Sequence, residues 1–155
     1  MKSKQIIIKP MSLVFAMILM MLSFSSCALK PEAPDENNFS LVMDYAQTTV
    51  RVGQKVTYRA ILKNNSENVY TLDHTQKIIY ISVVKASEYK DENIVAASDS
   101  QTNIAPHGQI EEFYEFAPTE KGEYILKAFA SFSIDGKDGI KEYMYECEEI
   151  KITVK

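Results

Sequence analysis

Residue patterns that support catalysis or phosphate binding are scarce in this sequence of 155 residues. It contains only five glycines, and they do not form a glycine-rich phosphate-binding loop. Serines are plentiful, but none lies in a nucleophile elbow. These absences exclude a recognisable nucleotide-binding loop and a recognisable hydrolase nucleophile.

Histidine is also rare: His74 and His107 are the two in the chain, and they lie 33 residues apart beside turn residues. This separation lacks the short spacing of a metal-ligand pair, so we expect ordinary exposed histidines. A metal pair is the alternative, if the two loops converge. The segment Asp135–Asp138 lacks the alternating acids and distal glutamate of a calcium loop, which favours a hairpin turn. We predict no metal and no cofactor.

Acidic residues are numerous in the second half of the chain, where they follow strand-like segments. Scattered carboxylates of this kind usually form solvated faces, and no neighbouring groups identify a general acid and a general base. An enzyme that uses these carboxylates is therefore the least favoured function. The residues concerned are Glu111, Glu112, Glu115, Glu142, Glu146, Glu148 and Glu149.

No apolar run near the N-terminus is long enough to cross a bilayer as a helix. Met11–Phe24 contains 14 residues, whereas a spanning helix needs about 20. Lys2, Lys4 and Lys9 precede this run, and small serines follow it. This arrangement predicts a secretory signal peptide over residues 1–26.

The segment Phe24-Ser25-Ser26-Cys27 resembles the bacterial lipobox, in which a signal peptidase cleaves just before a cysteine that carries diacylglycerol. Phe24 stands where leucine is usual. The resemblance implies that Cys27 becomes a lipidated N-terminus, on the bacterial cell membrane or the outer membrane. Each buried methylene contributes about 0.8 kcal/mol, so two or three acyl chains hold a protein essentially permanently. The alternatives are an uncleaved signal anchor and secretory cleavage after Ala28.

Cysteine is limited to Cys27 and Cys147. If Cys27 carries lipid through a thioether, Cys147 has no intramolecular partner, although an exported compartment would permit a disulfide. Stability must then come from the core. We expect Cys147 to be a small buried hydrophobe rather than a reactive thiol.

The predicted signal peptide and the rest of the chain also differ in net charge. The 17 basic and 21 acidic residues give a net charge of −4, but residues 1–26 hold three lysines and no acid, which leaves −7 for the rest. An acidic domain is repelled by nucleic acid and by anionic lipid. We therefore predict no nucleic-acid partner and a membrane contact through the lipid alone.

Residues 27–38 include two prolines, several acids and two asparagines, and they show no apolar periodicity. This composition predicts a lipidated cysteine followed by a flexible tether. Residues 39–155 are long enough for one domain with its own core.

The pattern of residues 39–155 predicts an all-β fold. Short segments rich in Val, Ile, Tyr, Phe and Thr alternate with clusters of Asn, Gly, Asp and Pro, as in an immunoglobulin-like antiparallel β-sandwich of about 7–9 strands. One apolar face is clear in Val56–Leu62, and the longest runs from Tyr124 to Ile134. The predicted strands are Phe39–Tyr45, Thr48–Val52, Lys55–Lys63, Val69–Leu72, Ile78–Lys85, Ile110–Phe116, Glu123–Ile134, and Lys141–Val154 with a break near Cys147–Glu149. Ala86–Gln109 shows only a weak strand at Ile94–Ala96.

Turn motifs add a resemblance. The motifs are Ile61-Leu62-Lys63-Asn64-Asn65-Ser66, Pro106-His107-Gly108 and Gly122-Glu123-Tyr124. Over about Val50–Ile134 they resemble the immunoglobulin-like modules of bacterial surface proteins, in particular the family named after a bacterial intracellular proteinase inhibitor. The resemblance implies that the asparagine pair caps a strand end and that Tyr124 packs at a sandwich corner. It implies protease inhibition only weakly, because this architecture hosts many unrelated roles.

Aromatic residues provide a further signal, because neighbours on a strand face opposite sides. Phe113 opposes Tyr114 and Phe129 opposes Phe132, so some rings must lie outside the core. We expect the stretch Ala86–Gln109 to cover them, with a binding patch as the alternative. The rings concerned are Tyr80, Phe113, Tyr114, Phe116, Phe129 and Phe132.

The favoured function is a non-catalytic binding module at the cell envelope, most simply for a protein partner that is held by β-augmentation or by loops. The alternative is a protease inhibitor, which needs a loop such as Asn64–Asn68 or Ser98–Pro106 that resists cleavage.

Overall fold

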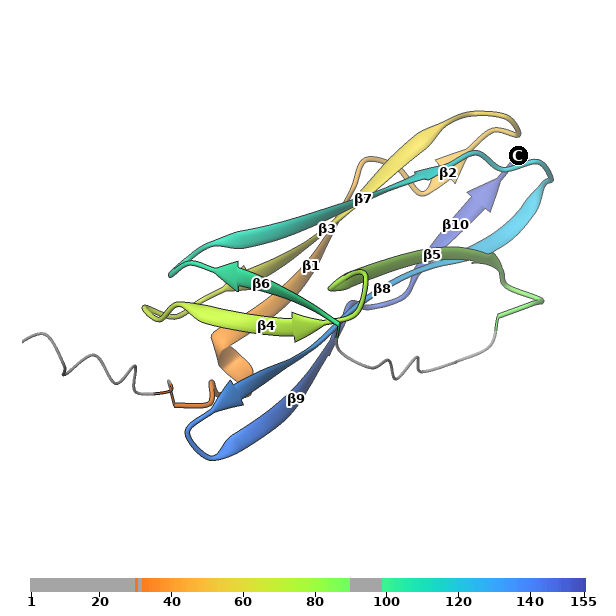
Figure 1. Cartoon of the computed structure of the whole chain (residues 1–155). Coiled ribbons are helices and arrows are strands. Elements are labelled where there is room, and N and C mark those ends of the chain that lie inside the picture. Colours follow the sequence, from red (N-terminus) through yellow and green to blue (C-terminus); the bar gives the residue numbers. More distant parts are fainter. Residues whose placement is uncertain (1–29, 31, 90–98) are drawn as a thin grey trace, which may run out of the picture. The chain divides into compact units, whose positions relative to one another are not determined.

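The computed structural model describes residue 30, residues 32–89 and residues 99–155. Ten strands form two sheets in these residues, so the fold is all-β (Figure 1). The smaller sheet is antiparallel, with the order β1-β3-β7. Its strands are β1 (Phe39–Tyr45), β3 (Val56–Asn64) and β7 (Gln109–Phe116).

The larger sheet is built around β8 (Gly122–Gly136). One edge of β8 pairs first with β10 (Ile150–Val154) and then with β9 (Gly139–Glu146). Its other edge pairs with β5 (Ile79–Lys85) and, at Ser133, with β4 (Tyr70–His74). Two outer strands complete the sheet: β6 (Ser100–Ile104) beside β4, and β2 (Thr49–Val50) parallel to β10.

Alternation of side chains along β8 explains its central position. Residues with even numbers from Tyr124 to Ile134 are all buried, as predicted for the longest inward face. Small Ala128 and Ala130 lie between the large side chains of this face, which lets the two sheets approach each other at the middle of the strand.

The core consists of two clusters along the sandwich. The first gathers around Phe39, Leu62, Leu72 and Phe132, and the second gathers around Tyr58, Phe116, Leu126 and Ile152. Val56, Tyr58, Ala60 and Leu62 are all buried, which confirms the predicted inward face of β3.

Tyr124 forms the corner that the turn motif predicts. Its ring is buried, and its hydroxyl donates a 3.0 Å hydrogen bond to the carbonyl of Glu120, four residues upstream at the β7–β8 connection. This bond is the tyrosine corner of immunoglobulin-like sandwiches. Together with the two-sheet topology it confirms the predicted fold.

Asn64 caps the end of β3, as the turn motif implies. Its side chain is buried; Nδ2 donates to the carbonyls of Asn68 at 2.7 Å and Ala105 at 2.9 Å, and Oδ1 accepts from the amide and hydroxyl of Ser66. Every polar atom of this buried amide therefore has a partner, which removes the penalty of burying it.

Some residues just before Phe39 also pack on the sandwich. Pro34 is buried, and its carbonyl accepts a 2.8 Å bond from the hydroxyl of Tyr143. A short 3-10 helix, η2 (Glu36–Asn38), follows. The composition of residues 27–38 predicts a flexible tether; in the structure, Ala33, Pro34 and Glu36 of this segment contact the β8–β9 hairpin.

Two predicted features of the strands are present in the structure, and one strand is present that was not predicted. The break between β9 and β10 is confirmed, as is the hairpin turn at Gly136 and Gly139, which pair with each other. β6 was not predicted, because its sequence Ser-Gln-Thr-Asn-Ile is polar; it forms as an outer strand that needs only β4 as a partner. The weak strand expected at Ile94–Ala96 lies outside the described residues.

Two tyrosine-to-phenylalanine changes test the fold in opposite directions. Tyr58 is fully buried, and its hydroxyl has no hydrogen-bond partner among the described residues. Tyr124→Phe removes the corner bond and should lower the free energy of unfolding by about 1 kcal/mol, whereas Tyr58→Phe removes only an unsatisfied group and should leave it equal or raise it. Urea unfolding measures both; equal losses would contradict the assigned hydrogen bonds.

Candidate functional site

The predicted lipidation site, Cys27, lies outside the described residues, as does the predicted signal peptide over residues 1–26. In the part of the chain that the structure describes, no helix is long and apolar enough to cross a membrane.

The two histidines have separate structural roles. His74 is buried, contrary to the expected exposure, because its ring bonds to the Thr102 hydroxyl at 2.9 Å and to the Thr75 carbonyl. His107 is exposed beside Glu67, in a turn where its φ of 55° is left-handed. Among residues 30, 32–89 and 99–155, no three potential metal ligands gather.

The carboxylates are spread over several surfaces, and many have cationic partners. Glu115 pairs with Lys55, Glu111 with Arg59, and Glu146 with Lys127. Glu149 accepts a hydrogen bond from the Tyr89 hydroxyl. These ion pairs neutralise single carboxylates on solvated faces.

Cys147 is half-buried against the first core cluster. Burial raises the pKa of its thiol above the ordinary value. The thiol is therefore protonated at neutral pH, as expected for a packing residue rather than a nucleophile.

The aromatic rings divide between the core and the surface, as the alternation predicts. Phe116 and Phe132 are buried, whereas Phe113 is 58% exposed. Tyr80 and Phe129 stack with their centroids 4.9 Å apart, on the face of the larger sheet that points away from the core. Tyr80, Phe113 and Tyr114 all line one groove.

This groove lies where the two sheets meet at one side of the sandwich. β5 of the larger sheet and β7 of the smaller sheet are neighbours there, but they are not paired. In the described chain, each of these strands is hydrogen-bonded to another strand along one edge and is unpaired along the other.

The hydrogen-bond pattern between β3 and β7, and between β5 and β8, shows which backbone amides of β7 and β5 are unpaired. The amide of Asn64 donates to the carbonyl of Gly108 at 3.0 Å. In an antiparallel ladder every second pair of opposite residues is hydrogen-bonded, so the amides of Ile110, Glu112 and Tyr114 point to β3. The amides of Glu111, Phe113 and Glu115 point away from β3. The amide of Ser131 donates to Ile78 at 3.0 Å, so the amides of Ile79, Ile81 and Val83 point away from β8. Both edges can therefore donate hydrogen bonds to an added segment.

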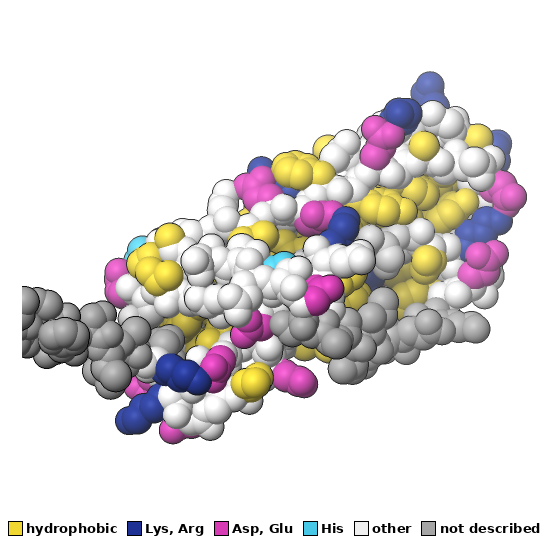
Figure 2. All heavy atoms as spheres, in the orientation of Figure 1, with side chains coloured by type: hydrophobic (Ala, Val, Ile, Leu, Met, Phe, Trp, Pro, Cys, Tyr) yellow, Lys and Arg dark blue, Asp and Glu magenta, His cyan; other side chains and the backbone are white. Residues whose placement is uncertain are grey.

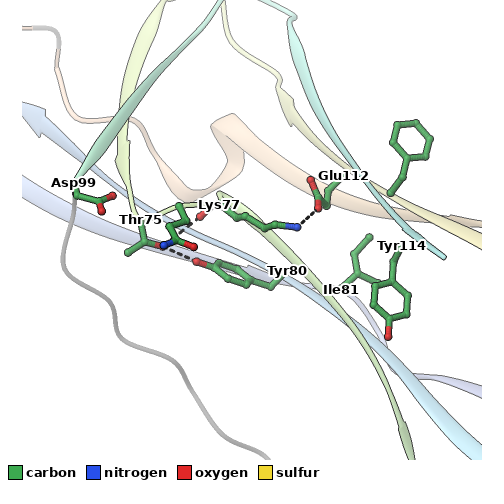
Figure 3. A pocket seen from close by; sticks show the side chains of 9 residues that line it. Thr75, Lys77, Tyr80, Ile81, Asp99, Glu112 and Tyr114 are labelled. Carbon is green, nitrogen blue, oxygen red and sulfur yellow. Dashed lines mark hydrogen bonds and ion pairs between the residues drawn. The ribbon is translucent and has the colours of Figure 1, made fainter. Parts of the chain in front are cut away.

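Side chains give the groove an apolar floor and polar ends (Figure 3). Ile81 and Tyr114 lie side by side on the floor, and Tyr80 reaches the Thr75 hydroxyl with a 2.5 Å hydrogen bond. Lys77 and Glu112 form an ion pair across the groove. The cavity has a volume of about 540 Å³ and is also lined by Gln76, Asp99 and Phe113.

Glu112 is unusual because it faces inward. It pairs with fully buried Ala60, so it shares the inward register of Ile110, Tyr114 and Phe116. An inward charge on an edge strand opposes uncontrolled pairing with another sheet. The inward position of Glu112 can be recognised in the sequence, because it is the one acid among the alternating residues Ile110, Glu112, Tyr114 and Phe116. Its partner Lys77 lies in the connection between β4 and β5, so no spacing in the sequence predicts the ion pair.

Charged side chains of both signs occur on the face of the molecule that Figure 2 displays. They are interspersed there with hydrophobic side chains. A mixed surface of this kind favours a partner that combines apolar and polar contacts over a strongly charged polymer.

Comparison with known proteins gives no family. No protein-family model matches the chain, and no curated protein matches it. The resemblance to the proteinase inhibitor family therefore stays a prediction.

Solved structures with similar folds include three of different kinds. The CARDB domain of a Pyrococcus furiosus protein, in complex with di-metal ions, is 16% identical over 82% of this chain and 93% of that chain, with a TM-score of 0.41. The sporulation control protein Spo0M from Bacillus subtilis is 12% identical over 76% and 49%, with a TM-score of 0.39. A β-glucosidase from Listeria innocua, in complex with isofagomine, is 11% identical over 75% and 16%, with a TM-score of 0.39. With TM-scores below 0.5, these likenesses carry no argument about function.

Proposed function

We propose that this protein is a lipid-anchored envelope lipoprotein whose sandwich is a non-catalytic module that binds an extended segment of a protein partner. The groove between β5 and β7 carries the proposal. Free amides on its strand edges can pair with a peptide backbone, and Ile81 and Tyr114 offer an apolar floor for one side chain of that peptide.

The ion pair on the groove supports recognition rather than catalysis. Lys77 and Glu112 neutralise each other, and they can exchange this contact for polar groups of a ligand. The polar side chains that line the groove are Thr75, Gln76, Lys77, Tyr80, Asp99, Glu112 and Tyr114. The hydroxyls of Thr75 and Tyr80 bond to each other, whereas an activated nucleophile would need an adjacent base. No cofactor is required for this role.

Protease inhibition is the second candidate, and one observation favours it. The loop Asn64–Asn68 is held from inside by the Asn64 side chain, and rigidity of this kind helps a loop to resist cleavage while bound. In the other candidate loop, Ser98–Pro106, the residues Ser100–Ile104 form β6, which pairs with β4. A stable stoichiometric complex between the protein and an envelope protease would favour inhibition, and indifference would favour the binding module.

The anchor has a direct test. We expect the intact mass of the membrane-extracted protein to equal residues 27–155 plus acyl chains, and we expect Cys27→Ser to abolish the added mass and the membrane association. A native mass equal to an unmodified chain that begins at Leu29 would contradict lipidation and indicate secretion.

The groove is tested with peptides selected from a random library against the purified sandwich. Phe113 and Val69 are 58% and 57% exposed, so Phe113→Ser and Val69→Ser remove matched apolar side chains inside and outside the groove. Loss of an aromatic contact costs on the order of 1 kcal/mol or more, so Phe113→Ser should weaken binding about tenfold.

Val69→Ser should leave the affinity of the same peptides unchanged. Equal effects of the two changes, or selection of no peptide at all, would contradict the groove as the binding site. Isothermal titration of each purified variant measures the affinities.

A further inference from the structure

The first described residues of the domain are fastened to one end of the sandwich. A Cβ added to Gly136 would lie only 3.2–3.3 Å from atoms of Ala33, so the β8–β9 hairpin closely contacts this segment. The hydroxyls of Tyr143 and Tyr145 donate to the carbonyls of Pro34 at 2.8 Å and Glu36 at 3.0 Å. Burial raises the pKa of Tyr145 to about 12, so its hydroxyl keeps the donated proton at physiological pH.

The β3–β4 loop and the β6–β7 turn lie at the same end of the sandwich. The amide of Asn65 donates to the carbonyl of Asn38 at 2.7 Å, which joins the β3–β4 loop to η2. The amide of His107 donates to the carbonyl of Ser66 at 3.3 Å, which joins this loop to the β6–β7 turn. The hairpin, the loop and the turn therefore form one end of the domain, which we call the hairpin end.

The opposite end gathers the C-terminus and two other connections. The amide of Gly53 donates to Pro118 at 2.8 Å, and that of Val52 donates to Lys155 at 3.2 Å. β8 runs between the two ends over 15 residues, and at about 3.3 Å per residue it separates them by roughly 46 Å. Figure 1 shows the β8–β9 turn and the C-terminus at opposite ends of the sandwich.

We infer that the hairpin end faces the lipid surface and that the opposite end, with Gly53, Pro118 and Lys155, points away from it. This inference rests on the proposed lipidation of Cys27. Ala33 lies six positions after Cys27, and a chain of six steps reaches at most about 20–22 Å. This reach is less than half the length of β8. A chain this short cannot let the sandwich invert so that the opposite end lies at the lipid surface.

Charge keeps this end from sinking into the lipid. Exposed acids outnumber exposed lysines there, so anionic headgroups repel it and the reach of the chain sets the distance. The exposed acids are Glu32, Asp35, Glu36, Glu67, Asp135, Asp138 and Glu142, and the exposed lysines are Lys30, Lys63, Lys137 and Lys141.

The orientation assigns different access to the two candidate sites. The loop Asn64–Asn68 belongs to the hairpin end and faces the membrane, which disfavours docking of a folded protease on it. The groove lies beside Ile81, which pairs with Ala128, eight residues from Gly136 along β8 and roughly 26 Å from the hairpin turn. A partner can therefore approach the groove from the side.

The test uses the full lipidated protein in vesicles of neutral lipid with an energy acceptor on the headgroups. Lys137→Cys and Lys121→Cys place a donor dye on exposed turns at the hairpin end and at the opposite end, in a Cys147→Ala background. We expect efficient energy transfer from position 137 and loss of transfer from position 121. Equal transfer from the two positions, or stronger transfer from 121, would overturn the orientation.

Mass spectrometry of the same samples separates the two proposals. Acyl chains on Cys27 with equal transfer from both positions would refute the orientation alone, whereas missing acyl chains would refute the anchor and the orientation with it. Tyr143→Phe removes the bond to Pro34 and should reduce the difference between the positions. Tyr58→Phe, which removes a hydroxyl without a described partner, should leave the difference unchanged.

Discussion

The sandwich depends on the length and the alternation of β8. This strand of 15 residues is long enough to pair with β10 and β9 in succession on one edge and with β5 and β4 on the other. Its inward side chains contribute to both core clusters, so this one strand connects the two clusters. A shift of β8 by one residue would expose this whole face.

The open groove follows from the same arrangement. Because β5 and β9 both pair with β8, neither extends the smaller sheet, and β7 keeps a free edge beside β5. Inward Glu112 protects this edge, since its charge with Lys77 opposes the pairing of another sheet. The feature that limits aggregation thus lines the surface that we propose for binding.

The fold was largely predictable, and the groove was not. The alternation in β3 and β8, the glycine turns and Tyr124 all act through local periodicity or turn chemistry, so they are visible in sequence. The packing of Pro34 against Tyr143 spans 109 residues, and the meeting of Lys77 with Glu112 spans 35, so no spacing rule finds them. β6 was missed because a polar outer strand lacks the apolar alternation that identifies its neighbours.

Amide hydrogen exchange along β7 tests most directly whether this edge is open. If it is, the amides of Glu111, Phe113 and Glu115 exchange quickly in the free protein, while those of Glu112 and Tyr114, which point to β3, are protected. This period of two is the predicted result. Uniform protection of all five amides would contradict it, because another segment or a second copy would then cover the edge.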